Sequence, residues 1–359
     1  MLFTKIMLSI MAVFSGIAVA DKIFFHNRFG YGKEFDLGLC TLGPIVISMA
    51  GFLCAVPVLQ KCLIPVSTLI SRMTGADPSM FSSTFLAIDM GGLPLALQTA
   101  ASPSIAAFTG GLYASIMGAS ISFIMPFALE TLAPSQQPYL AKGMLYGICV
   151  IPVTCVIGGI FLGLTPGFIL RNVFPVLLLS ALLILGLTHF PELLLSGFQS
   201  FSKFIRVLAH IFLFCAIFYD LTGYALLPGI YTISSQIPVI GTISITLAGA
   251  YPFIKFLTIA FQKTFSYLAK KLHLTDTCIP ALLICTSNCI PTIEKLSEMP
   301  PKEKILCVAF MVQSAFIFGD HLAYLSVTIP EYLPAILFAK LAGGFIAVFF
   351  ACFMENRQK

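Results

Sequence analysis

The residues of this chain that could do chemistry are a few polar side chains inside long apolar segments. The first is Asp89, in the stretch Gly75–Ala96, which interrupts its own helical pattern with Gly91, Gly92 and Pro94. An isolated carboxylate in hydrocarbon costs about 3 kcal/mol or more, and glycine and proline both weaken a helix. A segment that contains all of these is typical of a site for a solute or an ion and not of a plain lipid anchor.

A second interrupted segment follows at Leu282–Ile293. It carries Asn288, which is preceded by Thr286 and Ser287 and followed by the helix breaker Pro291. Two interrupted apolar segments at matching positions of two halves indicate the binding site of a transporter.

A third polar group is the pair Asp320 and His321, in the middle of the otherwise apolar segment 304–328. Gly319 precedes the pair and Tyr324 follows it. An adjacent acid and imidazole inside a membrane could bind a substrate or relay a proton, because histidine titrates near neutral pH. The alternative is a structural ion pair between the two side chains.

The elements that position these residues must be membrane helices. The chain is 58% hydrophobic and only 10% charged, with a mean hydropathy of +0.99. Soluble domains carry roughly 25% charged residues, so this composition predicts an integral membrane protein with little room for a soluble domain. The net charge of +5 lies in short loops, where basic residues report membrane orientation, and we expect no nucleic-acid partner.

The sequence contains no pattern that favours an enzyme. The eleven cysteines lie mostly in apolar runs, and no histidine or second cysteine pair completes a metal site, so we interpret them as small buried apolar residues. Neither a phosphate-binding glycine loop, a Walker A sequence nor a G-x-S-x-G pattern occurs. We therefore expect no cofactor, no metal and no direct use of ATP.

Nine unbroken apolar segments are interpreted as membrane-spanning, since about 20 residues cross a bilayer as a helix. They cover residues 1–20, 39–59, 105–129, 143–164, 173–189, 204–219, 239–261, 304–328 and 334–353. The first could instead be a secretory signal, but a helix is favoured because segment 204–219 is its counterpart and likewise leads into an aspartate. Lys61–Arg72 is too short to cross, and we expect it to lie on the membrane surface.

An internal repeat links the two halves of the chain. The sequence Ile47–Gly51 resembles Ile245–Gly249, which begins 198 residues later. At a shift of 199 residues Asp21 corresponds to Asp220, Asp77 to Asp276, and Asp89 to Asn288. We therefore expect one membrane domain made of an N-terminal repeat (1–165), a linking helix (166–202) and a C-terminal repeat (203–359).

The basic residues test two topologies. If both interrupted segments also cross, giving eleven crossings, the lysines and arginines divide nine to nine between the two sides. If both segments are re-entrant, nine crossings remain and the division is fourteen to four. The positive-inside rule favours the second arrangement, with the N-terminus outside and the two repeats inverted.

Three stretches carry a resemblance to a known family. GADPSMFSSTFLAIDMGG (75–92), ITLAGAYP (245–252) and FIFGDHLAYLS (316–326) look like the signature segments of the bacterial ethanolamine-utilisation permeases, the EutH-type transporters. Order and spacing agree over nearly the whole chain. The chain departs from the family pattern at Leu93-Pro94 and at Ser287-Asn288-Cys289, which leaves open another small amine or amino alcohol as the substrate.

The resemblance implies a site for ethanolamine, a cation at neutral pH with a hydroxyl at its other end. Such a site needs a carboxylate or an aromatic face for the ammonium and a neutral group for the hydroxyl. Asp89 is expected to bind the ammonium, although it could instead cap the broken helix or pair with Lys340. Asn288 is expected to bind the hydroxyl or donate to Asp89, although it could merely satisfy backbone at the break.

Further side chains are expected to complete this site. Tyr251 could stack on the ammonium or simply pack in the core. The remaining expected lining residues are Asp320, His321, Tyr324, Thr286, Ser287, Ser82 and Thr84, with Gly91, Gly92, Pro94, Pro291 and Gly319 shaping the backbone.

The resemblance therefore predicts a multi-pass, all-α permease of the bacterial inner membrane that binds a small molecule, contacts lipid and works by alternating access. Coupling to a proton and assembly as a homo-oligomer are left open. Three alternatives remain: an ion-coupled transporter of another solute, a membrane enzyme that uses Asp89, Asp320 and His321, and a receptor that binds without transport.

Overall fold

The computed structural model describes residues 2–357, and helices are the regular secondary structure throughout this range. Eight helical segments are long and apolar enough to cross a membrane. They are α1 (Leu2–Phe24), the run from α2 to α4 (Tyr31–Thr74), the run from α7 to α8 (Pro103–Thr131), the run ending in α9 (Pro134–Phe161), α10 (Pro166–His189), α11 (Pro191–Thr222), α12 (Ile233–Ala260) and α18 (Leu333–Arg357). The expected all-α, multi-pass architecture is confirmed.

Several of these segments are built from more than one element. The first run comprises α2 (Tyr31–Cys40), α3 (Leu42–Ile45), the π-helix η1 (Val46–Ala50) and α4 (Gly51–Thr74). The second comprises α7 (Pro103–Ala106), the π-helices η3 (Ala107–Gly118) and η4 (Ser120–Ile124), and α8 (Met125–Thr131). The third begins with the short η5 (Pro134–Gln136) before α9 (Gln137–Phe161). Wider π-helical turns are frequent at functional sites.

Segment 304–328, predicted as one span, is broken, and that prediction was wrong. The helix α16 (Pro301–Ser314) ends before residues 315–319, and α17 (Asp320–Thr328) starts after them. Phe316 has a φ of 64°, a left-handed conformation that no continuous helix allows. The backbone freed by this break bonds to the neighbouring interrupted segment, as described below.

Lys61–Arg72, which we expected to lie on the membrane surface, is not a short element of its own. These residues form the last turns of α4, which continues to Thr74 and ends at Gly75 with a φ of 73°. The helix α4 packs against α11. A shorter helix in the second half, α13 (Gln262–Lys271), follows α12.

The two segments with Gly and Pro breakers are interrupted in the structure. The first consists of α5 (Ser79–Phe85), extended residues 86–87, η2 (Ile88–Gly92) and α6 (Leu93–Thr99). The second consists of α14 (Cys278–Cys285), a turn at 286–289, α15 (Ile290–Lys295) and η6 (Leu296–Glu298). None of these pieces is long enough to cross a bilayer as a single helix.

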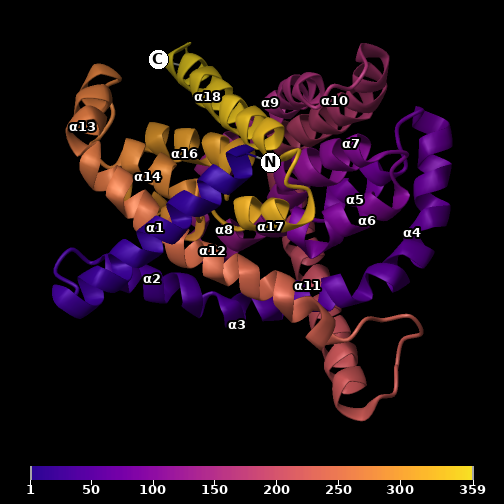
Figure 1. Ribbon diagram of the computed structural model, residues 1–359. Helices are drawn as coiled ribbons and strands as arrows, with labels where there is room; N and C mark the ends of the chain where they lie inside the picture. Colours follow the sequence, from indigo (N-terminus) through magenta and orange to yellow (C-terminus); the bar gives the residue numbers. More distant parts are fainter. Residues whose placement is uncertain (1, 358–359) are drawn as a thin grey trace.

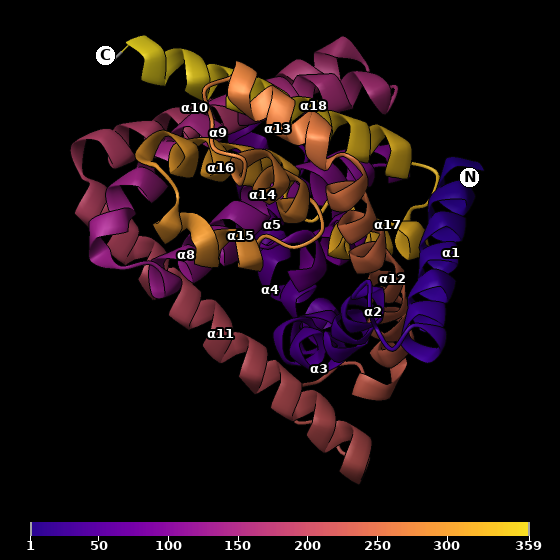
Figure 2. The same ribbon diagram turned by 90° about the vertical axis from the view of Figure 1, so that its left-hand side faces the viewer.

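The helices form two packed groups around these interrupted segments. The helix α12 packs against α1 and α2 on one side, while α9 packs against α10, α16 and α18 on the other. Figures 1 and 2 both show the C-terminal end of α11 extending beyond the rest of the molecule at the lower edge. Figure 2 shows α13, α18 and α10 together at the opposite end.

Small residues bring the first interrupted segment against η3. A Cβ added at Gly118 would overlap the carbonyl oxygen of Leu86, and one added at Gly110 would lie 2.7 Å from the Cα of Leu93. Membrane helices use such residues for close approach, because lipid provides no hydrophobic drive for helix association. The glycines therefore hold residues 86–92 in place.

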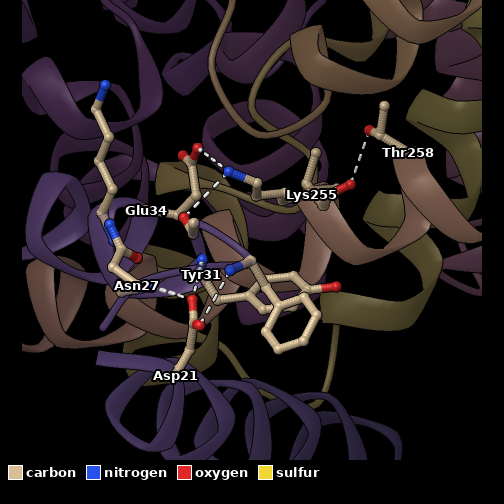
Figure 3. Close-up of polar contacts among 11 residues, drawn as sticks. Asp21, Asn27, Tyr31, Glu34, Lys255 and Thr258 are labelled. Carbon is tan, nitrogen blue, oxygen red and sulfur yellow. Dashed lines mark hydrogen bonds and ion pairs between the residues drawn. The ribbon is translucent and has the colours of Figure 1, made fainter. Parts of the chain in front are cut away.

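A polar cluster holds the turn between α1 and α2 (Figure 3). The buried carboxylate of Asp21 accepts hydrogen bonds from the backbone N–H groups of Phe29, at 3.1 Å, and Tyr31, at 2.8 Å. Lys255 on α12 donates to the carbonyl oxygen of Gly30 at 3.0 Å and pairs with Glu34 at 3.4 Å. These contacts connect α2 to α12.

The close packing at Gly118 makes a test of the fold. We expect Gly118→Ala to destabilise the protein by about 1–3 kcal/mol, because the new methyl group must displace the backbone at Leu86. The measurement is thermal unfolding in detergent. The matched control is Gly197→Ala on the exposed side of α11, where nothing lies within 4 Å, and it should be neutral or slightly stabilising. Equal melting temperatures for the two variants would contradict this account.

Candidate functional site

A cavity of about 320 Å³ lies where the three interrupted regions meet. Its polar lining residues are Thr41, Ser48, Asp89, Tyr251, Asn288, Asp320 and His321. Its apolar lining residues are Pro44, Ile45, Met49, Ala87, Met90, Ala119, Phe123, Ile290 and Phe316. A mainly apolar pocket with a few convergent polar groups is typical of a small-molecule site, and this volume is at the small end of the usual range.

The two interruptions of the second half stabilise each other. The N–H of Phe316 donates to the carbonyl oxygen of Cys285 at 3.2 Å, and that of Phe318 donates to Thr286 at 2.7 Å. Gly319 lies so close to the backbone of Ser287 that no side chain fits between them. Irregular backbone inside a membrane protein is tolerated where it is satisfied by protein or lines a cavity, and both conditions hold here.

Two carboxylates line the cavity, and neither is paired. Asp89 is the second residue of η2, and Asp320 is the first residue of α17. Among residues 2–357, the ion pairs are Lys22–Asp36, Lys142–Glu355, Arg206–Glu130 and Lys255–Glu34. The alternatives of an Asp89–Lys340 pair and of an Asp320–His321 pair were therefore wrong.

Asn288 and Tyr251 form one polar wall of the cavity. The amide nitrogen of Asn288 donates to the hydroxyl of Tyr251 at 3.2 Å, and its amide oxygen accepts from the N–H of Ile290 at 2.9 Å. The second contact satisfies the backbone N–H of Ile290 at the start of α15, which is the alternative role that the sequence left open for Asn288. Asn288 thus supports the break and also faces the cavity.

His321 is held from behind by a buried lysine. Nζ of Lys340 lies 2.9 Å from Nδ1 of His321 and donates to the carbonyl oxygen of Ser115 at 2.8 Å. The ring of Phe316 lies 5.3 Å from the imidazole, centre to centre. The position of His321 is therefore set by α18, η3 and the break before α17.

Five of the expected lining residues do not border the cavity. The hydroxyls of Ser82, Thr84, Thr286 and Ser287 donate to carbonyl oxygens three or four residues earlier, and Tyr324 is buried in the core.

The glycines and prolines that were expected to shape the backbone act on their own segments. Gly91 has a φ of 105°, Gly92 lies against the carbonyl oxygens of residues 86 and 87, and Pro94, Pro291 and Gly319 stand at helix starts.

The sequence did not single out Thr41 and Ser48, which line the cavity from the α3–η1 region. Each hydroxyl donates to the backbone of its own helix, Thr41 to Gly38 at 2.6 Å and Ser48 to Pro44 at 2.9 Å. The breaker pair Gly43-Pro44 inside a predicted span was the signal that could have revealed this region.

Within the part of the chain that the structure describes, no three His, Cys, Asp or Glu side chains gather as metal ligands.

The double role of Asn288 can be separated by substitution. We expect Asn288→Ala to cost about 1 kcal/mol, because the N–H of Ile290 loses its acceptor, while Asn288→Ser restores an acceptor and recovers most of this loss. Both variants lose the contact to Tyr251 equally, so their difference reports the backbone contact alone. The measurement is thermal unfolding in detergent. Equal melting temperatures for the two variants would show that the amide oxygen does not stabilise the break.

Comparisons with known proteins identify the family of this chain. A family model described as "Ethanolamine utilisation protein, EutH" matches residues 3–354. The chain is 36% identical to the "Probable ethanolamine permease EutH" of Listeria monocytogenes, and the match covers 100% of this chain and 96% of that protein. It is 37% identical to "Uncharacterized protein YxeR" of Bacillus subtilis, over 92% of this chain and 90% of that protein. It is 33% identical to the "Probable ethanolamine permease EutH" of Escherichia coli, over 99% of this chain and 96% of that protein. No solved structure matches the chain. The protein belongs to the EutH family of ethanolamine utilisation proteins.

Proposed function

We propose that this protein is a permease that carries ethanolamine, as the protonated cation, across the bacterial inner membrane by alternating access. The observation that carries the proposal is the cavity with two unpaired carboxylates, Asp89 and Asp320, beside neutral hydrogen-bonding groups. Three relatives named as probable ethanolamine permeases support the same substrate.

The chemistry of the cavity suits both ends of ethanolamine. The ammonium binds Asp89, with Asp320 nearby in the same lining, through charge-assisted hydrogen bonds. The hydroxyl binds the neutral wall formed by Tyr251 and Asn288 or the imidazole of His321. The apolar remainder of the lining, including Phe123 and Phe316, surrounds the two methylene groups and excludes larger polar solutes.

The position of the cavity supports alternating access. Its lining comes from residues 41–123 of the proposed first repeat and residues 251–321 of the proposed second repeat. Each half has an interrupted segment, then the segment 103–131 or 301–328, then a long helix, α9 or α18. We propose that these halves are inverted repeats joined by α10 and that both interrupted segments are re-entrant. Rocking of one repeat against the other would expose the cavity to each side in turn.

A second candidate is an ion-coupled transporter of another small amine. One ammonium needs one carboxylate, so the second carboxylate is free to carry a coupling proton. Uptake driven by a proton gradient, in the absence of a membrane potential, would favour this candidate over a uniporter. Competition by other amines against labelled ethanolamine shows whether ethanolamine or another small amine is the preferred substrate.

Removing the charge of Asp89 tests the ammonium site. We expect Asp89→Asn to lower the initial rate of ethanolamine uptake at low substrate by about ten- to a hundredfold, because a charge-assisted contact contributes about 1.5–3 kcal/mol. The measurement is uptake of radiolabelled ethanolamine into proteoliposomes. Asp276→Asn, at an exposed carboxylate outside the cavity, is the control and should retain the wild-type rate. Wild-type uptake by the Asp89 variant would remove this residue from the site.

Membrane potential tests which form of ethanolamine moves. If the cation crosses alone, an inside-negative potential of 100 mV is worth about 2.3 kcal/mol and should raise accumulation roughly fiftyfold. A potassium diffusion potential imposed on proteoliposomes provides the driving force, and empty liposomes give the leak. Accumulation that ignores the potential would contradict transport of the charged form.

A further inference from the structure

Lys340 is a fully buried lysine that the ethanolamine site itself does not require. Its exposed fraction is 0%, and it lies in the middle of α18, away from either end of the helix. Burial of a charge is costly unless the charge is paired, yet no carboxylate of the described residues lies within ion-pair distance of Nζ. Its contacts are the carbonyl oxygen of Ser115 and Nδ1 of His321.

The hydrogen bonds of Lys340 decide how His321 is protonated. As an ammonium, Lys340 has three donors and no acceptor, so Nδ1 of His321 accepts at 2.9 Å. The imidazole is then neutral, and its proton is on Nε2. Nε2 has no partner among residues 2–357, and His321 borders the cavity. The imidazole therefore offers the cavity a single N–H donor, which fits a hydroxyl oxygen and opposes another ammonium.

The net charge around the cavity suits the binding of one monovalent cation. With both carboxylates ionised, Asp89 and Asp320 carry two negative charges, and Lys340, as an ammonium behind His321, carries one positive charge. The other ionisable group in the lining, Tyr251, is neutral at physiological pH. A single ammonium therefore neutralises the site, whereas a dication would place its second charge beside His321 and Lys340.

We propose that Lys340 determines the specificity of this site: it holds His321 as a neutral N–H donor to the substrate hydroxyl and repels a second ammonium, so that the site accepts amino alcohols and rejects diamines. This inference rests on the proposed transport of ethanolamine. It assigns the ammonium of the substrate to the carboxylates and the hydroxyl to His321.

Two variants of Lys340 separate its charge from its hydrogen bonds. Lys340→Gln keeps N–H donors for Ser115 and His321 but removes the charge, whereas Lys340→Met removes both. The test is competition against labelled ethanolamine by 3-amino-1-propanol and by 1,3-diaminopropane, which differ only in the end group. Ethylamine, which lacks the hydroxyl, is the third competitor.

In the wild type we expect the amino alcohol to compete at least about tenfold better than the diamine, since a like charge in a site of low dielectric opposes binding by more than 1 kcal/mol. Both variants should lower this preference by about tenfold. Lys340→Gln should keep the preference for ethanolamine over ethylamine, while Lys340→Met should lose most of it. A lysine with only a structural role would reduce uptake and leave both preferences unchanged, and that result would overturn the inference.

A second readout keeps this test independent of transport. The same compounds are compared by the increase that each causes in the melting temperature of the purified protein, which needs binding but no flux. Absence of wild-type uptake would defeat the proposed function, whereas equal protection of wild type and variants by the diamine would defeat the specificity role of Lys340. If neither Lys340 variant folds, His321→Leu replaces them in the test. This variant should lose the preference for ethanolamine over ethylamine and should still exclude the diamine. Any other pattern contradicts the inference.

Discussion

The structure depends on the need to satisfy every backbone N–H and C=O group inside the membrane. Residues 86–87, 286–289 and 315–319 leave the helical conformation where no water is expected to compensate. In the second half the two breaks bond to each other, through Phe316 to Cys285 and Phe318 to Thr286. In the first half, glycines of the π-helical η3 let the break approach closely. The cavity exists because these irregular segments meet.

Polar side chains in the cavity are arranged as complementary walls. Asp89 and Asp320 stand near the starts of η2 and α17, and no lysine or arginine of the described chain forms an ion pair with them. Asn288 and Tyr251 satisfy each other in part. Lys340 stands behind His321, outside the lining, and so its charge acts on the cavity without occupying it.

A second polar region connects the cavity to the rest of the fold. Lys255 lies four residues after Tyr251 on α12, so the two side chains share one helix face. Its contacts with Gly30 and Glu34 tie that face to α2, and Asp21 holds the turn that presents these partners (Figure 3). The wall that carries Tyr251 is thereby connected to α2, whose run continues into the cavity at Thr41 and Ser48.

The sequence by itself determined most of the membrane helices and the main polar residues, since composition reports the solvent of the chain and intramembrane charges are too costly to be incidental. Five of its predicted polar site residues, from Asp89 to His321, line one cavity. Tertiary structure alone decided the break at 315–319, because carbonyl groups of Cys285 and Thr286, distant in sequence, stabilise it. It also decided that Thr41 and Ser48 face the cavity while Ser82 and Thr84 do not, because the direction of a side chain depends on the packing of its helix.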